Sequence, residues 1–325
     1  MKVNDTADQT LSNDRRTKKP SLTKRHAGIK SVRQNWDLYL LILPVILYFL
    51  IFKYYPMYGA QIAFKNFLAV EGITGSPWVG FDHFIRFFDS FYFWRLIKNT
   101  LFIGLYELAL GFPIPIILAL MINEVKNKRF KQIVQTVTYA PHFLSTVVVV
   151  ALLFMLLSPA TGVLNNIIAA FGGEPIAFMT EPGWFKTTYV LSGVWQTMGW
   201  SSIIYLAALS GIDPQLKEAA MIDGASKLQT IWHINLPAIK PTIIIMLILQ
   251  CGSIFGVGFE KVFLMQNNLN MAASDVIATH VYRTGILGSQ YSYSTAIGLF
   301  ESVINFTILL IVNYVARKVN KVSLW

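Results

Sequence analysis

The chain has 325 residues, of which 54% are hydrophobic and only 14% are charged, and its formal net charge is +10. Soluble domains carry about a quarter of charged residues, so this composition excludes an ordinary water-soluble fold and indicates a membrane protein. One cysteine, Cys251, excludes an intrachain disulfide. The positive charge lies mainly in the N-terminal tail and short loops, which argues against nucleic-acid binding.

Residues 1–35 form a basic tail. Nine of the 27 Lys and Arg residues precede Asp37. No small-residue cleavage site follows the first apolar segment, so this is a tail and not a cleavable signal peptide. Its polar, charged composition predicts that it is partly disordered, and its basic residues favour contact with anionic lipid of the bilayer.

Six apolar segments after the tail are long enough to cross a bilayer, which takes about 20 helical residues. The first contains Pro44 and Lys53, which a membrane helix tolerates when neighbours satisfy the freed carbonyl. The sequence therefore predicts an all-α polytopic membrane protein, with a six-span domain over residues 36–325. In chain order the segments are Trp36–Met57, Asn99–Ile122, Ile133–Leu157, Thr187–Ser210, Thr242–Phe263 and Tyr293–Ala316.

The basic residues assign the loops to sides of the membrane. The tail, the 123–132 loop, the 211–241 loop and the C-terminus hold 19 of the 27 Lys and Arg residues. Cytoplasmic loops are the richer in Lys and Arg, so both termini and the 211–241 loop are expected inside. Longer outer loops, roughly 58–98, 158–186 and 264–292, either bind an external partner or simply connect helices.

The 211–241 loop carries the signals of two short helices. Asp213 is a good N-cap before Pro214, and Gly224 suits the left-handed position that ends a helix. Ser226 and Gln229 then form a capping-box pattern that starts a second helix. We expect this helix to stop at Pro237, and Pro241 to begin the fifth span.

The first of these short helices has a small apolar surface. Leu216, Ala219, Ala220 and Met221 supply it, and Glu218 adds one negative charge. Small alanines allow a partner groove to approach the backbone, as in helix-in-groove recognition. An amphipathic linker lying in the membrane interface explains the same pattern, and the residues alone leave both interpretations open.

Two motifs resemble one family. Glu218-Ala219-Ala220, Gly224 and Ile234-x-Leu236-Pro237 fit the EAA signature of the permease subunits of ABC importers at every position. The stretches 54–65 (YYPMYGAQIAFK) and 75–80 (GSPWVG), with Ala140-Pro141-His142-Phe143, are similar to the oligosaccharide branch that serves maltose, alginate and rhamnogalacturonan fragments. The resemblance covers nearly all of the chain after the tail.

The resemblance implies a division of labour in a bacterial plasma (inner) membrane. Two cytoplasmic ATPase subunits would use ATP and Mg, while this chain binds no cofactor and is not an enzyme. The chain itself has no phosphate-binding P-loop. A second homologous permease would form a heterodimer with this chain, and the first helix would pack around that partner. An extracellular or periplasmic solute-binding protein would complete the importer. The ATPase-coupling residues would be Glu218, Ala219, Ala220, Asp223, Gly224, Leu236 and Pro237.

Polar residues within the predicted spans suggest a substrate path, since such residues usually face the protein interior or a wet cavity. Ser192, Gly199 and others in the fourth span recur at three- and four-residue spacing. A sugar needs hydrogen-bond partners and flat apolar faces. The proposed path residues are Trp195, Gln196, Trp200, Ser202, Gln250, Ser253 and Asn305. Hydrogen bonds between helices explain the same residues equally well.

Two other functional classes deserve comparison. A secondary transporter driven by ions or protons could use Glu107 and Glu301, although these carboxylates also fit structural roles, and no duplication of the two halves is visible. A membrane-embedded enzyme lacks a recognisable acid–base pair, and no His/Cys cluster suggests a metal site. The spans contain few Arg or Lys residues, which favours a neutral sugar.

Overall fold

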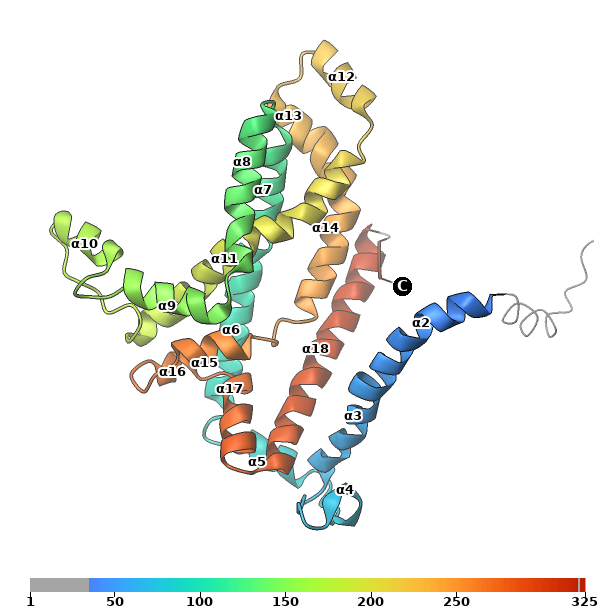
Figure 1. Ribbon diagram of the computed structural model, residues 1–325, viewed down its shortest axis with the longest axis vertical. Helices are drawn as coiled ribbons and strands as arrows, with labels where there is room; N and C mark the ends of the chain where they lie inside the picture. The colour runs from blue at the N-terminus through green and yellow to red at the C-terminus, as the bar shows by residue number, and fades with distance from the viewer. Residues whose placement is uncertain (1–34, 321, 325) are drawn as a thin grey trace, which may run out of the picture. The chain divides into compact units, whose positions relative to one another are not determined.

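The computed structural model describes residues 35–320 and 322–324, and Figure 1 shows their helices. Within these residues there is no β-strand, and an isolated bridge joins Lys65 to Trp78. The prediction of an all-α protein is therefore confirmed. In this described part of the chain, four helices are long and apolar enough to cross a membrane, and a bent pair of helices makes a fifth candidate. The predicted basic tail lies outside the described residues, except for Asn35.

The chain divides into two compact units, residues 1–59 and 60–325, which are described separately. In the first unit, α2 (Trp36–Phe49), the π-helical turn η1 (Leu50–Tyr54) and α3 (Tyr55–Met57) follow one another without a break. All residues from 36 to 58 are exposed, although most are large and apolar. An apolar helix exposed on every side is suited to lipid or to a covering partner.

The second unit begins with a segment held by local contacts. It contains η2 (Tyr58–Phe64, which starts in the first unit), α4 (Gly72–Gly75) and α5 (Asp82–Phe88). The buried Lys65 Nζ donates hydrogen bonds to the carbonyls of Ile73 at 2.7 Å and Thr74 at 3.4 Å. The same ammonium lies 4.8 Å from the centre of the Trp78 ring. A buried charge paired in this way fixes the loop.

Helix α11 (Pro182–Ser210) is the central element of the second unit. It packs against α6 (Phe93–Gly111), α7 (Pro113–Asn123), α8 (Lys128–Tyr139) and α14 (Leu236–Cys251). Helices α6 and α7 together form one candidate span, Phe93–Asn123, which contains the predicted segment 99–122. At 29 residues α11 is about 43 Å long, but it is not among the four apolar candidates.

The predicted third span is not straight. Helix α8 and the 3-10 turn η3 (Ala140–Phe143) are followed by α9 (Thr146–Leu156) at a bend of 102°. Leu144 and Ser145 are extended, and the Ser145 side chain caps α9 by accepting from Val148 N. A capping serine after a proline-containing turn thus starts a new helix. Helix α10 (Val163–Ala170) follows.

The fifth span differs from the prediction at both ends. Helices α12 (Pro214–Ile222) and α13 (Lys227–Thr230) precede the π-helical turn η4 (Ile231–Asn235), which continues directly into α14. The expectation that a helix stops at Pro237 was therefore wrong. The π turn widens the helix just before this proline and so accommodates its ring and its missing N–H. The span ends at Cys251, since a glycine-rich segment separates it from α15 (Phe259–Met265).

The predicted outer loop 264–292 folds onto the spans. It contains α16 (Met271–Ser274), α17 (Ile277–Val281) and η5 (Tyr282–Leu287), and α18 (Tyr291–Asn320) follows. Asn99 Nδ2 in α6 donates to the carbonyls of Ala272 at 2.9 Å and Asp275 at 3.0 Å. The buried Asp275 carboxylate pairs with Arg283.

Asn270 fastens the same loop. It is fully buried, and its Nδ2 donates to the carbonyls of Met179 and Met265, both at 3.0 Å. Its Oδ1 accepts from Asn267 N at 3.0 Å and from Ser274 Oγ at 2.9 Å. One amide thus satisfies four groups that come from the loop and from the segment before α11.

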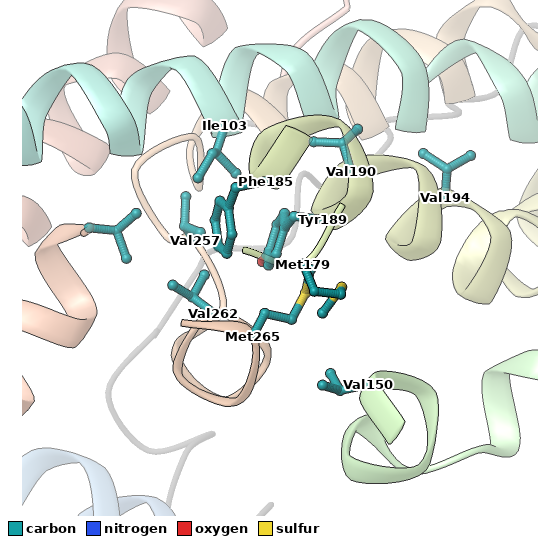
Figure 2. Packing of buried hydrophobic residues seen from close by; sticks show 11 residues of the cluster. Ile103, Val150, Met179, Phe185, Tyr189, Val190, Val194, Val257, Val262 and Met265 are labelled. Carbon is teal, nitrogen blue, oxygen red and sulfur yellow. The ribbon is translucent and has the colours of Figure 1, made fainter. Parts of the chain in front are cut away.

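The largest apolar core lies where α6, α9, α11 and α15 meet. Figure 2 shows Phe185 and Tyr189 of α11 among Ile103, Val262 and Met265. Helices α8 and α11 also approach closely, because a Cβ on Gly199 would lie 2.1 Å from the Thr138 carbonyl oxygen. This crossing therefore depends on a residue without a side chain.

Candidate functional site

The 211–241 loop contains the two predicted short helices, and α12 stands at the upper end of Figure 1. Asp213 caps α12 by accepting a hydrogen bond from Gln215 N at 2.9 Å. Gly224, with φ of +75°, ends it. Ala225 N donates to the Ala220 carbonyl at 2.9 Å, which is the six-to-one bond of a Schellman turn. The predicted start and end of this helix are confirmed.

The second short helix begins with the predicted capping box. Ser226 N donates to Gln229 Oε1 at 2.7 Å, and Gln229 N donates to Ser226 Oγ at 3.4 Å. The two helices are therefore separated by the turn at Gly224, which sets the angle between them.

Helix α12 has an uncovered surface. It contains no buried residue, and Leu216, Met221 and Ile222 remain 55%, 63% and 86% exposed. Glu218 and Ala219 are exposed and Ala220 is partly buried, while Asp223 and Gly224 form the exposed turn. An apolar surface with one carboxylate is thus free for a partner or for the membrane interface.

The second half of the loop is anchored, unlike α12. Ile231 and Leu236 pack against a cluster that includes Tyr205 and Leu209 of α11 and Ile239 of α14. Leu236 and Pro237 begin α14, so the predicted coupling residues fall into two groups. One group lies on the uncovered α12 and its turn, and the other joins the loop to the core.

A polar cavity lies between α6, α7, α11 and α14. Its volume is about 390 Å³. Helices α6 and α7 contribute Glu107 and Pro115, while α14 and the segment after it contribute Gln250 and Ser253. The complete lining is Glu107, Gly111, Phe112, Pro115, Val194, Thr197, Ser201, Tyr205, Met246, Leu249, Gln250 and Ser253.

Two side chains in this polar cavity have unused hydrogen-bonding capacity. Glu107 and Gln250 make no side-chain hydrogen bond to residues that the structure describes, and they also line a neighbouring pocket of about 100 Å³. Ser253 Oγ donates to the Gln250 carbonyl at 3.1 Å, and Thr197 Oγ1 donates to the Gly193 carbonyl at 2.9 Å. Chemically, the cavity offers acceptors and donors for hydroxyl groups beside apolar surface.

The structure brings Gln250 and Ser253 together in the polar cavity, but not the other five predicted path residues. Trp195 lines a separate apolar cavity of about 350 Å³, with residues of α9, α10 and α11. Trp200 stacks on His142, with ring centres 4.6 Å apart. Both tryptophans therefore contact elements away from the polar cavity.

The remaining three predicted path residues make hydrogen bonds within the protein. Gln196 Nε2 donates to the Leu144 carbonyl at 3.0 Å, at the bend between α8 and α9. Ser202 Oγ is buried and donates to the Gly199 carbonyl at 2.6 Å. Asn305 Oδ1 accepts from Phe255 N at 3.1 Å. The Gln196 and Asn305 bonds join separate segments, as the alternative that the sequence also allowed requires, whereas the Ser202 bond lies within α11.

Sequence reasoning missed part of the cavity lining. Thr197, Ser201 and Tyr205 recur every four residues on α11, on a face beside the one selected from the sequence. Their spacing shows that they share one face of the helix, but it does not show that this face borders the cavity. Glu107, which the sequence favoured as a structural group, lines the cavity. In the described part of the chain no group of three or more His, Cys, Asp or Glu residues could hold a metal ion.

Comparisons with known proteins identify one family over most of the chain. The family described as "Binding-protein-dependent transport system inner membrane component" matches residues 111–321. The chain is 47% identical over 290 residues to the polygalacturonan/rhamnogalacturonan transport system permease protein YteP of Bacillus subtilis (strain 168), covering 89% of this chain and 90% of that protein. It is 45% identical over 293 residues to Protein LplB of the same organism, covering 90% and 92%.

A solved structure is similar to most of the chain. It belongs to a bacterial ABC transporter involved in the import of the acidic polysaccharide alginate, with a TM-score of 0.83 and 44% identity. The match covers 90% of this chain and 99% of that one. The conclusion rests on the signature in the 211–241 loop, the family match over residues 111–321 and these two relatives. The chain belongs to the inner membrane components of binding-protein-dependent transport systems.

Proposed function

We propose that this chain is one permease subunit of an ATP-driven, binding-protein-dependent importer of an oligosaccharide. The observation that carries the proposal is the similarity to YteP and to the alginate transporter over about nine-tenths of the chain. The polar cavity supports it, because hydroxyl groups of a sugar need the kind of partners that Glu107 and Gln250 offer.

The names of these relatives favour a sugar that contains uronic acid, in contrast to the neutral sugar that the sequence favoured. The polar cavity of this chain has no basic residue and one carboxylate, Glu107. A carboxylate beside a uronate would repel it, since like charges at close distance are unfavourable. In our proposal, positive charge for a uronate comes from the second permease or from the binding protein.

The partners follow from the same proposal. A solved structure similar to this chain is that of an alginate ABC transporter in complex with an alginate pentasaccharide-bound periplasmic protein. We propose that this chain pairs with a homologous permease and receives sugar from a solute-binding protein. Two ATPase subunits, which hold ATP and Mg, complete the importer. The exposed apolar helix α2 is suited to lipid or to the second permease.

The 211–241 loop is the proposed docking site for one ATPase subunit. The exposed apolar residues of α12 and the Glu218 carboxylate fit a groove of a partner, and the anchored α13–α14 segment fits a lever that carries movement into the membrane. The proposed coupling residues are the seven predicted from the sequence: Glu218, Ala219, Ala220, Asp223, Gly224, Leu236 and Pro237.

Transport and ATP use test the function together. The complex, purified with its natural partners and placed in lipid vesicles, is expected to take up alginate or rhamnogalacturonan oligosaccharides only when ATP is present on the loop side. Uptake that persists without ATP hydrolysis but collapses with an uncoupler would instead support a secondary transporter.

The topology is a further part of the proposal: six spans over residues 36–325, with both termini and the 211–241 loop in the cytoplasm. Cys251 is the chain's cysteine, so a Cys251→Ala background permits labelling at single introduced sites. A cysteine at Lys217 should be protected from an impermeant maleimide in intact cells, while one at Glu71 should react. Labelling of the Lys217 site from outside would reverse the orientation.

A further inference from the structure

A buried asparagine joins the 211–241 loop to the second span. Asn235 is the last residue of η4 and is 0% exposed. Its Nδ2 donates a hydrogen bond to Glu124 Oε1 at 3.0 Å, across 111 positions of sequence. Glu124 directly follows α7, and the Asn123 side chain next to it donates to the same oxygen at 3.3 Å. Hydrogen bonds to a charged acceptor are about twice as strong as those between neutral groups.

The same asparagine has an unsatisfied acceptor. Asn235 Oδ1 is buried and has no hydrogen-bond partner among the residues that the structure describes. Such an orphaned group raises the free energy of the conformation that contains it. A conformation in which η4 turns and Oδ1 accepts a hydrogen bond would not carry this energetic cost.

Asn235 lies where the 211–241 loop meets the membrane helix α14. On one side stands the loop whose helix α12 is uncovered, and on the other begins α14. Between them lies a π turn, an element that is frequent at functional sites. Helices α7 and α14 form two walls of the polar cavity, through Pro115 and Gln250. A bond between the bases of the two helices therefore constrains how the cavity opens.

We propose that Asn235 and Glu124 are a pair of positioning residues that transmit movement of the 211–241 loop to α7, so that the two walls of the polar cavity move together when the ATPase subunits close. The inference rests on the proposed function and adds to it a residue pair that the EAA signature does not specify, since Asn235 is its variable position and Glu124 lies outside it. Neither residue touches substrate, and their role is to make movement of α14 also a movement of α7.

Four variants of the complete importer test the pair, with Asn123→Ala as matched control. Asn235→Ala removes the bond, and Asn235→Asp places two carboxylates against each other. Glu124→Gln keeps an acceptor oxygen for Asn235. The double variant E124Q/N235D restores a hydrogen bond in the opposite direction, from the glutamine Nε2 to the new carboxylate.

The readouts are ATPase activity with and without sugar-loaded binding protein, sugar imported per ATP hydrolysed, and capture of the ATPase subunits. Alginate and rhamnogalacturonan oligosaccharides serve as probes. N235A and N235D should lose about 5-fold or more of the stimulation by loaded binding protein, the lower end of typical coupling between sites. Both should retain the ATPase subunits. E124Q, N123A and the double variant should remain near the wild type.

Two results would overturn the proposed role of the pair. One is stimulation of the N235A ATPase activity equal to that of N123A. The other is a double variant whose stimulation does not recover relative to N235D. If N235A fails to assemble, the comparison of N235D with the double variant decides. A wild-type complex that no probe stimulates would instead reject the proposed function, so the two failures are distinguishable.

Discussion

Replacing Gly224 by alanine or valine is expected to weaken binding of the ATPase subunit to this chain about 5- to 30-fold, without unfolding the chain. Gly224 has φ of +75°, a conformation that costs residues with a side chain about 1–2 kcal/mol. A Cβ placed there would meet no atom within 4 Å, so the cost is conformational and not steric. In the variants this conformational cost favours other turn geometries, in which α12 points in another direction.

The magnitude follows from the population of the competent turn. If only a fraction of molecules holds α12 in the docking orientation, the apparent dissociation constant rises by the inverse of that fraction. A cost of about 1–2 kcal/mol corresponds to about 5- to 30-fold. Gly224→Asn should lose less than Gly224→Val, because asparagine enters the left-handed region more readily.

The assay is binding of the purified ATPase subunit to the permease in detergent, together with thermal unfolding of the permease. Gly211→Ala is the matched control: Gly211 is the first residue of the loop, with φ of −83°, and its Cβ would make only an ordinary contact of 3.5 Å. Docking of Gly224→Val at the wild-type affinity, or equal losses for Gly211→Ala, would refute the argument that the turn sets the docking angle.

Three further predictions concern the second unit. Asn270→Ala removes four buried hydrogen bonds and should destabilise the protein by about 3–5 kcal/mol, seen as a lower Tm, whereas the exposed Asn166→Ala should change little. Gly199→Ala should cost about 1–3 kcal/mol in the same measurement, since its Cβ would overlap the Thr138 carbonyl, while Gly183→Ala, which meets nothing, should be harmless. Ser201→Trp should fill the polar cavity and abolish uptake in vesicles while the ATPase subunits remain bound; normal uptake would separate the cavity from the path.

The local chemistry of short segments made part of this protein predictable. Asp213, Gly224 and Ser226 fix the ends of α12 and α13 through contacts within a few residues, and these contacts are present in the structure. Most spans follow from apolar length alone, because the bilayer sets that length. The roles of the coupling residues stay predictions, since docking involves a surface that another protein provides.

The failures arise where distant contacts decide. Pro237 breaks a helix in isolation, but here the π turn and the packing of Leu236 against α11 hold the helix together through it. Ser145 is a different case: it starts a new helix through a local cap on Val148 N, which the apolar content of the segment does not reveal. The face of α11 that borders the polar cavity depends on where α7 and α14 pack, so Thr197 could not be told from Gln196 by spacing alone.

The bonds of Asn99 have a consequence for biosynthesis. Its amide nitrogen reaches carbonyls of Ala272 and Asp275, and Thr100 Oγ1 accepts from Ile277 N at 3.1 Å, so two polar side chains of an early helix find their partners in a late segment. A ribosome delivers Asn99 long before residue 272 emerges, and until then this amide must be satisfied by water, lipid headgroups or the insertion machinery. Nascent chains released before residue 277 would therefore keep a polar, unfinished helix end, a feature by which membrane quality control could recognise them.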